Sequence, residues 1–239
     1  MIAQICEESK CTGCLACMNL CPCGAITCQE REDGNVIPQI DPEKCIECHR
    51  CVQGCPENHV KEKHEPRQCY ATWQKDRKER KYSASGGIAF GFYKRWIQNA
   101  GIVYGAAFNE KGILTQQKAE TLEEARKFRG SKYVQSYNGF SYSEIGKELK
   151  KGKKVLFIGT PCQIAGLKAY LGKASDALVT IDLICHGTPP MSYLEEYIKE
   201  IAGAEKVDRV SFRGEKDYHM VFYSQDRVVY SQRFRKDLY

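Results

Sequence analysis

Cysteine is the residue type with the clearest chemical pattern in this chain. The 239 residues contain 14 cysteines, and all but Cys162 and Cys185 lie at or before Cys69. No basic region followed by an apolar stretch opens the sequence, so a secreted, disulfide-stabilised protein is not indicated. In a reducing compartment, this density of cysteine is typical of metal or redox chemistry. We therefore expect a cytoplasmic metal or redox protein.

The N-terminal cysteines form an internal repeat. Residues 11–22 read CTGCLACMNLCP and residues 45–56 read CIECHRCVQGCP, with cysteine at relative positions 1, 4, 7 and 11 followed by proline. In this C-x2-C-x2-C-x3-C-P pattern the first three thiolates bind one [4Fe–4S] cluster and the fourth binds its neighbour. The repeat thus predicts one cluster held by Cys11, Cys14, Cys17 and Cys55, and a second held by Cys45, Cys48, Cys51 and Cys21.

Zinc is the alternative for these thiolates. Two C-x2-C pairs supply the four ligands of a structural zinc site. Zinc sites do not normally add a third cysteine at the same interval and a fourth before proline, so the spacing favours iron–sulfur clusters. The cysteines outside the repeat are interpreted as small, buried apolar side chains without a ligand role. They are Cys6, Cys23, Cys28 and Cys69.

The rest of the chain alternates buried strands with helices. Strand-like runs cover residues 102–108, 154–158 and 178–184, and helical apolar spacing covers 88–99 and 163–171. This alternation favours an α/β domain with a largely parallel sheet. Further strands are expected at 207–212, 220–223 and 228–231, and Thr121, Ser141 and Ser192 mark helix starts because each precedes a glutamate by three residues.

Two cysteines follow strands of this predicted domain. Cys162 in GTPCQ begins a helix, where the helix dipole favours its thiolate. Cys185 in CHG ends the next strand, with His186 beside it. Parallel strands joined by a helix end at one sheet edge, so we expect both cysteines near one crevice. Their role remains open between cluster ligation, redox chemistry, lining a cofactor pocket and an inert thiol in the core. His186 could equally cap a helix or lie in the core.

A Ser-Gly-Gly sequence opens the helix predicted at 88–99. Ser85, Gly86 and Gly87 leave backbone N–H groups available for a phosphate, although a flexible N-cap is the alternative. Neither G-x-G-x-x-G nor a Walker P-loop occurs. The formal charge is +6, but no basic stripe interleaved with aromatic residues indicates nucleic acid. No apolar run approaches the roughly 18 residues of a membrane span.

The N-terminal repeat resembles bacterial-type two-cluster ferredoxins, and the features that follow it resemble the beta-subunit family of coenzyme F(420) hydrogenases and dehydrogenases. The resemblance to the second family rests on four segments, namely CYATWQKDRKERKYSASGG (69–87), FRGSKYVQS (128–136), KVLFIGTPCQIAGLKAYLG (154–172) and IDLICHGTPP (181–190). It implies an iron–sulfur flavoprotein oxidoreductase that relays electrons between a reduced organic donor, for example a deazaflavin coenzyme, and two [4Fe–4S] clusters through FAD. A ferredoxin-like electron-transfer adaptor without catalysis is the alternative.

The same resemblance implies candidate residues and partners. The candidates for the FAD pocket are Ser85, Gly86, Gly87, Ser131, Lys132, Tyr133, Cys162 and Cys185. Two roles are open for Lys132: it binds a flavin phosphate or the reduced flavin ring, or it is an ordinary surface lysine. The expected partners are a redox protein or other oxidoreductase subunits, and a small-molecule electron donor or acceptor. No catalytic residue is identified.

Three parts are expected along the chain. They are a two-[4Fe–4S] ferredoxin domain at 1–64, a charged connector at 65–85 and an α/β flavin and substrate domain at 86–239. The fold class is an α+β ferredoxin-like domain followed by an α/β domain with a largely parallel sheet. Family members usually continue with further cysteines, so the chain is either a short member or incomplete at its C-terminus.

Overall fold

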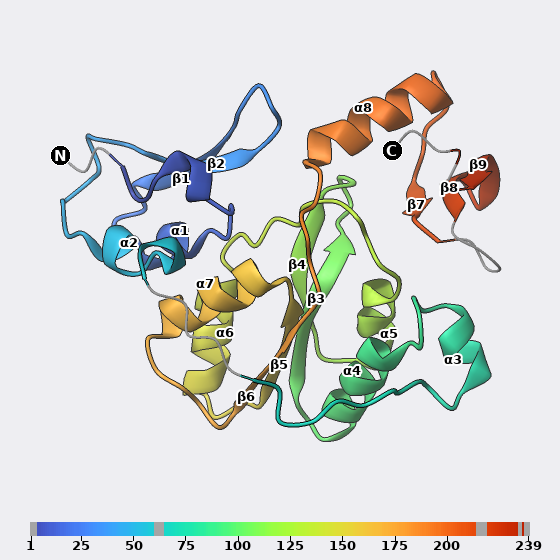
Figure 1. Cartoon of the computed structure of the whole chain (residues 1–239), viewed down its shortest axis with the longest axis horizontal. Coiled ribbons are helices and arrows are strands. Elements are labelled where there is room, and N and C mark those ends of the chain that lie inside the picture. The colour runs from blue at the N-terminus through green and yellow to red at the C-terminus, as the bar shows by residue number, and fades with distance from the viewer. Residues whose placement is uncertain (1–3, 60–64, 214–218, 234–235, 237–239) are drawn as a thin grey trace.

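The computed structural model of the chain describes residues 4–59, 65–213, 219–233 and 236. An N-terminal unit lies beside a central sheet with helices on both faces, and a second, smaller sheet lies near the C-terminus (Figure 1). The N-terminal unit consists of η1 (Glu8–Lys10), α1 (Ala16–Leu20), β1 (Ile26–Glu30), β2 (Val36–Ile40), α2 (Arg50–Gln53) and η2 (Pro56–Asn58), where η marks a short 3₁₀ helix. β1 and β2 form an antiparallel pair.

The central sheet has four strands in the order β4-β3-β5-β6. They are β3 (Ile102–Phe108), β4 (Leu114–Ala119), β5 (Val155–Gly159) and β6 (Leu178–Asp182). β3 pairs in parallel with β5, and β5 with β6, whereas β4 is antiparallel to β3. The prediction of a largely parallel sheet is confirmed. β4 was not predicted because three polar residues in succession, at 116–118, obscure its period of two.

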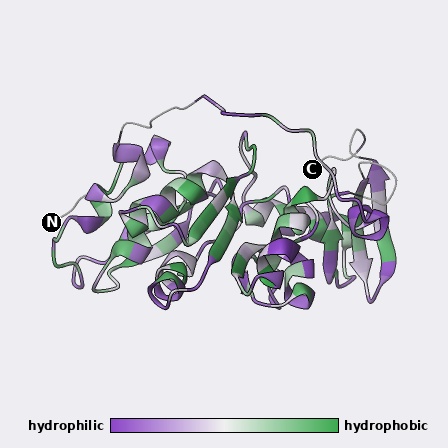
Figure 2. Cartoon of the chain, turned by 90° about the horizontal axis from the view of Figure 1, so that it is seen from below, coloured by the Kyte–Doolittle hydropathy of each residue, from purple (hydrophilic) through white to green (hydrophobic). Residues whose placement is uncertain are grey.

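Helices cover both faces of this sheet (Figure 1). They are α4 (Ile88–Gln98), α5 (Leu122–Ala125), η3 (Arg126–Phe128), α6 (Ser141–Lys150) and α7 (Pro161–Leu171), whereas α3 (Arg77–Lys81) lies apart from the sheet and buries no residue. Because neighbouring strand residues face opposite sides, Phe157 packs with α6 and α7 while Leu156 packs with α4. Figure 2 shows the central strands as largely hydrophobic and the helices as mixed. Both apolar cores therefore lie against the sheet.

Helix boundaries follow the sequence closely, except at two predicted helix starts. Thr121 and Glu124 form the predicted capping box of α5. α7 begins at Pro161 and ends before Gly172, whose φ is 68°. The prediction that Ser141 caps α6 is wrong, because the N-cap is Phe140 and Ser141 is already the first helical residue. The predicted start at Ser192 is wrong as well, because the helix at Met191–Ala202 has Pro190 as its N-cap and Ser192 as its second residue.

The C-terminal strands form a separate sheet rather than extending the parallel one. After α8 (Met191–Ala202), the strands β7 (Arg209–Ser211), β8 (His219–Ser224) and β9 (Arg227–Arg233) pair antiparallel in that order. Gln225 and Asp226 join β8 to β9 with φ of 48° and 64°. Two such residues make the tight turn of an antiparallel hairpin, and this turn lacks the Asn-Gly sequence that usually announces it. Across the described residues, no helix is long and apolar enough to cross a membrane.

The N-terminal unit is packed into the rest of the molecule through α1. Ala16 is 1% exposed and belongs to the same apolar cluster as Tyr142 and Phe157. The Asn19 side chain donates from Nδ2 to the carbonyl oxygen of Gly139 (2.8 Å) and accepts at Oδ1 from the Ser143 backbone N–H (3.1 Å). The first cysteine motif therefore shares a core with the α/β part.

Candidate metal centre

The two copies of the cysteine repeat have the same backbone conformation. At positions 3 and 5 of the first copy, Gly13 and Leu15 have φ of 64° and 63°. At the same positions of the second copy, Glu47 and His49 have φ of 54° and 57°. Residues with left-handed backbone turn successive N–H groups toward one side of the loop. The concave surface that these N–H groups form is common at Fe–S sites. Left-handed backbone at non-glycine residues costs energy and is concentrated at functional sites.

Two cavities lie beside these loops. The first, of about 340 Å³ with its opening to solvent included, has five cysteines in its wall, Cys6, Cys11, Cys14, Cys17 and Cys55. The second, of about 300 Å³ by the same measure, is lined by Cys21, Cys23, Cys45, Cys48 and Cys51. Each cavity thus combines three cysteines of one copy with the last cysteine of the other. The structure brings each predicted ligand set together, and bonding of these thiolates to iron remains a prediction.

The cavities are otherwise largely apolar, and their cysteines are part of the core of the N-terminal unit. Cys17, Cys51 and Cys55 are all buried in one apolar cluster. Burial is the main cause of the raised pKa values of Cys14, at about 11, and of Cys17. Binding of a metal as thiolate must therefore displace protons. Within the described ranges, no three His, Cys, Asp or Glu side chains converge closely enough to hold a single metal ion.

The four cysteines outside the repeat have different surroundings. Cys6 lines the first cavity and Cys23 the second. Cys28 is half-buried and donates its S–H to the sulfur of Met18 (3.9 Å), which agrees with apolar packing. Cys23 and Cys69 are exposed, so interpreting them as buried apolar side chains was wrong. Sequence spacing could not place Cys6 and Cys23 because neither belongs to the repeat.

The first cavity faces the α/β part of the molecule. The carbonyl oxygen of Cys14 accepts hydrogen bonds from Tyr142 Oη (2.8 Å) and Asn138 Nδ2 (3.1 Å). Burial is the main cause of the raised pKa of Tyr142, and the charge of Cys14 adds to it. The wall of the second cavity includes Ile46, which is 63% exposed.

The start of α7 is fixed by a buried amide. Gln163 is 4% exposed, and its Oε1 accepts from the Thr160 backbone N–H and from Gln116 Nε2, both at 3.1 Å. Its Nε2 donates to Ser136 Oγ (2.8 Å). Cys162 lies one residue earlier, with its sulfur 3.1 Å from Thr160 Oγ1. Sequence reasoning missed Gln163, although the Thr-x-x-Gln capping spacing was a usable signal.

Cys162 and Cys185 follow parallel neighbouring strands. Cys162 is half-buried in the first turn of α7, directly after β5, and Cys185 follows β6. Both therefore lie beyond the carboxyl ends of their strands. Cys185 and His186 are exposed, which does not support a core role for either residue.

Part of the predicted flavin set lies at the N-terminus of α4. Gly87, with φ of 71°, is the N-cap, and no side chain satisfies the first N–H groups of this helix. Arg213 donates to Ser85 Oγ (3.3 Å) and to Tyr133 Oη (2.8 Å). A guanidinium beside free helical N–H groups suits a phosphate. Arg213 was missed by sequence reasoning because no motif surrounds it. Gly86 packs closely against residues 72 and 73, and its carbonyl oxygen accepts from the Gln74 backbone N–H (2.8 Å).

Lys132 is engaged elsewhere. Its Nζ donates to the backbone carbonyl oxygens of Ala106 (2.9 Å), Lys127 (2.9 Å) and Arg129 (3.1 Å). These contacts use all three donors of an ammonium group. Burial lowers the pKa of Lys132 to about 7, while the three carbonyl acceptors favour the protonated form. In this structure Lys132 thus neither faces a phosphate site nor behaves as an ordinary surface lysine, and Ser131 is only half-buried beside it.

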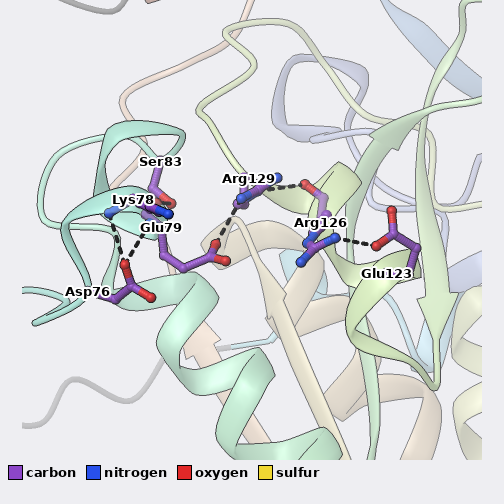
Figure 3. A network of polar contacts seen from close by, with 7 residues as sticks. All are labelled: Asp76, Lys78, Glu79, Ser83, Glu123, Arg126 and Arg129. Atoms are coloured by element: carbon purple, nitrogen blue, oxygen red, sulfur yellow. Dashed lines mark hydrogen bonds and ion pairs between the residues drawn. The ribbon is translucent and has the colours of Figure 1, made fainter.

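A polar network joins the connector to the segment that carries these residues (Figure 3). Asp76 caps α3 by accepting from the backbone N–H groups of Lys78 and Glu79. The Glu79 carboxylate pairs with Arg129 at 2.8 Å, with both side chains 19% exposed. The Arg129 guanidinium also lies 5.2 Å from the centre of the Phe90 ring in α4. Arg129 thereby ties α3 and α4 to the 129–133 segment.

Two cysteine-lined cavities of this pattern are typical of an iron–sulfur protein of the electron-transfer class. The comparisons give the same class. Residues 10–59 match the family model described as "4Fe-4S dicluster domain". Residues 152–236 match the family model for the C-terminal part of the coenzyme F420 hydrogenase/dehydrogenase beta chain. The resemblance predicted from the motifs is confirmed: the chain joins a 4Fe-4S dicluster segment to a segment that matches that beta-subunit family.

Curated relatives match only part of this chain. Over 48 residues it is 44% identical to one component of the Na(+)-translocating ferredoxin:NAD(+) oxidoreductase complex of Acetobacterium woodii, covering 20% of this chain and 13% of that protein. Over 57 residues it is 39% identical to an uncharacterized polyferredoxin-like protein of Methanocaldococcus jannaschii, covering 20% and 34%. The chain therefore spans well under half the length of either protein. A solved F420-reducing [NiFe] hydrogenase complex from Methanosarcina barkeri has a TM-score of 0.48 and 19% identity, over 68% of this chain and 59% of that one.

Proposed function

We propose that this chain relays single electrons between a site in its α/β part and a redox partner, through two [4Fe–4S] clusters. One observation carries the proposal: each cavity is lined by three cysteines from one copy of the repeat and the last cysteine of the other. The clusters are held by Cys11, Cys14, Cys17 and Cys55 in the first cavity and by Cys45, Cys48, Cys51 and Cys21 in the second. Such clusters supply one-electron transfer without an open iron site.

The packing of the cavities supports an order for this relay. The first cavity contacts the α/β part through the Cys14 carbonyl, Tyr142 and Asn138. The wall of the second cavity includes exposed Cys48 and Ile46. We assign the first cavity to exchange with the α/β part and the second to exchange with an external redox protein or another oxidoreductase chain.

For the α/β part we propose FAD, held by its phosphates at the N-terminus of α4. The uncapped N–H groups of this helix, together with Arg213 and Ser85, provide donors and positive charge for that purpose. Bound flavin supplies the exchange between two-electron chemistry on an organic donor, such as a deazaflavin, and single-electron transfer. In this role Tyr133 and Ser85 orient the Arg213 guanidinium, and Cys162 and Cys185 line the sheet edge.

The non-catalytic adaptor remains a second candidate because of Lys132. Its three bonds to backbone carbonyls leave it without a donor for a flavin phosphate or ring. An adaptor would keep both clusters and bind no FAD, so cofactor content separates the two candidates.

Anaerobic purification followed by iron, zinc and flavin analysis tests these proposals. We expect about eight irons per chain. Zinc in place of iron would contradict the relay, whereas eight irons without FAD would support the adaptor. Arg213→Ala should lower FAD content with iron unchanged. Arg209→Ala, which removes an exposed partner of Asp226 in the same small sheet, is the matched control and should alter neither.

A further inference from the structure

The second cavity contains a fifth thiol next to one of its predicted ligands. Cys23 lines the same wall as Cys21, and their two sulfur atoms are 3.7 Å apart. Both residues lie in the segment between α1 and β1, with only Pro22 between them. Cys23 lies outside the cysteine repeat, so neither the motif nor the dicluster match assigns it a role.

The surroundings of Cys23 allow its sulfur to move. Cys23 is exposed. Gly24, which follows it, has φ of 64° and open space around the position where a Cβ would lie. In contrast, Cys51 on the opposite wall is held in α2 and is 7% exposed. Cys21 is held more loosely, by one hydrogen bond from the Ala25 backbone N–H to its sulfur (3.3 Å). The part of the cavity wall around Cys21 and Cys23 is thus the part whose side chains can rearrange.

We propose that Cys23 is an alternate thiolate ligand of the second cluster and exchanges with Cys21 at one iron. The proposal rests on the proposed iron–sulfur function. In the exchange the bond from iron to the Cys21 sulfur breaks and one to the Cys23 sulfur forms. The Cys23 thiol proton passes to the departing Cys21 thiolate, so charge balances and no electron moves. The sulfur separation of 3.7 Å lets this occur by small rotations within one turn.

Exchange at this corner matters because of where the second cavity lies. Its wall includes exposed Cys48 and Ile46, which are within reach of oxidants and of a partner. A second thiol at the loosely held corner keeps the cluster at four ligands when Cys21 is lost or modified. Cys23 is the one cysteine outside the predicted ligand set among the residues that line this cavity, and the sulfur that it approaches to 3.7 Å is that of Cys21.

Iron content of four anaerobically prepared variants tests the proposal. Cys21→Ala and Cys23→Ala should each keep about eight irons per chain, because one thiol of the pair remains. The Cys21→Ala, Cys23→Ala double variant should keep about four, as should Cys51→Ala, whose ligand has no substitute. Cys21→Ala should also change the electron paramagnetic resonance signal of the second cluster alone. As a control, Cys28→Ala removes a cysteine that lines neither cavity and should match the wild type.

Each other outcome is decisive. If Cys21→Ala falls to about four irons like Cys51→Ala, Cys23 is not an alternate ligand. If the double variant keeps about eight, another group serves that corner and the proposal also fails. Retention of the first cluster in every variant shows that the chain has folded. Failure of the wild type to hold about eight irons contradicts the relay itself, and is thereby distinguished from failure of the exchange.

Discussion

Gly13 and Gly24 form a matched pair for testing how the first cavity is built. Both have φ of 64°, so an alanine at either position must adopt the same left-handed backbone. They differ in packing. A Cβ on Gly13 would lie 2.6 Å from Gln135 Nε2 and 3.1 Å from the Val36 carbonyl oxygen, whereas one on Gly24 would meet nothing within 4 Å.

The expected costs follow from these geometries. Left-handed backbone costs an alanine about 1–2 kcal/mol. The smaller entropy of the unfolded chain offsets part of this cost, equally at both sites. Gly13→Ala must in addition displace the Gln135 amide and the Val36 backbone, which we set at about 1–2 kcal/mol on the scale of overpacking. The difference in free energy of unfolding between the two variants should therefore be about 1–2 kcal/mol.

Thermal unfolding of the anaerobic holoprotein measures this difference. For a chain of this size, about 1–2 kcal/mol corresponds to a melting temperature roughly 2–8 °C lower for Gly13→Ala than for Gly24→Ala. Gly13→Ala should also lose iron from the first cluster faster on exposure to a chelator. Equal melting temperatures and equal iron loss would refute the close packing of the Gly13 loop against Gln135 and Val36.

Three further predictions concern the α/β part. In chemical unfolding, Arg129→Ala should destabilise the protein by about 2 kcal/mol, because it breaks a largely buried ion pair. The control Arg126→Ala breaks an exposed pair and should cost at most about 0.5 kcal/mol. Gln163→Leu leaves three buried polar groups without their partner and should lower the free energy of unfolding by about 3 kcal/mol. The control Gln98→Leu changes an exposed residue and should cost about 0.5 kcal/mol or less. Similar values for the two variants would contradict the buried amide network. Burial lowers the folded-state pKa of Lys132 to about 7, so the unfolded state binds the extra proton above that pH and stability should rise between pH 7 and about 10. Lys132→Met should remove this rise relative to the wild type, and an unchanged pH profile would show that the carbonyl bonds cancel the effect of burial.

The sequence predicted features that depend on local spacing. The cysteine intervals predicted which cysteines line a common cavity, because the spacing within a loop determines which side chains face one site. Helix α7 and its Gly172 stop followed from proline and glycine chemistry. Features that depend on contacts between distant segments could not be predicted. Arg213 meets Ser85 and Tyr133 only through tertiary packing, and Lys132 is turned inward by carbonyls on β3 and its own loop.

The crossed pairing of the cysteines is the central claim, and selective loss of one cluster tests it most directly. Cys17→Ala and Cys55→Ala, each in a Cys6→Ala background so that the extra thiol cannot substitute, are compared with Cys51→Ala by electron paramagnetic resonance of the remaining cluster. We predict that Cys17→Ala and Cys55→Ala leave the same cluster, with about four irons per chain, and that Cys51→Ala leaves the other. If Cys55→Ala instead leaves the same cluster as Cys51→Ala, each motif binds its own cluster and the crossed arrangement is wrong.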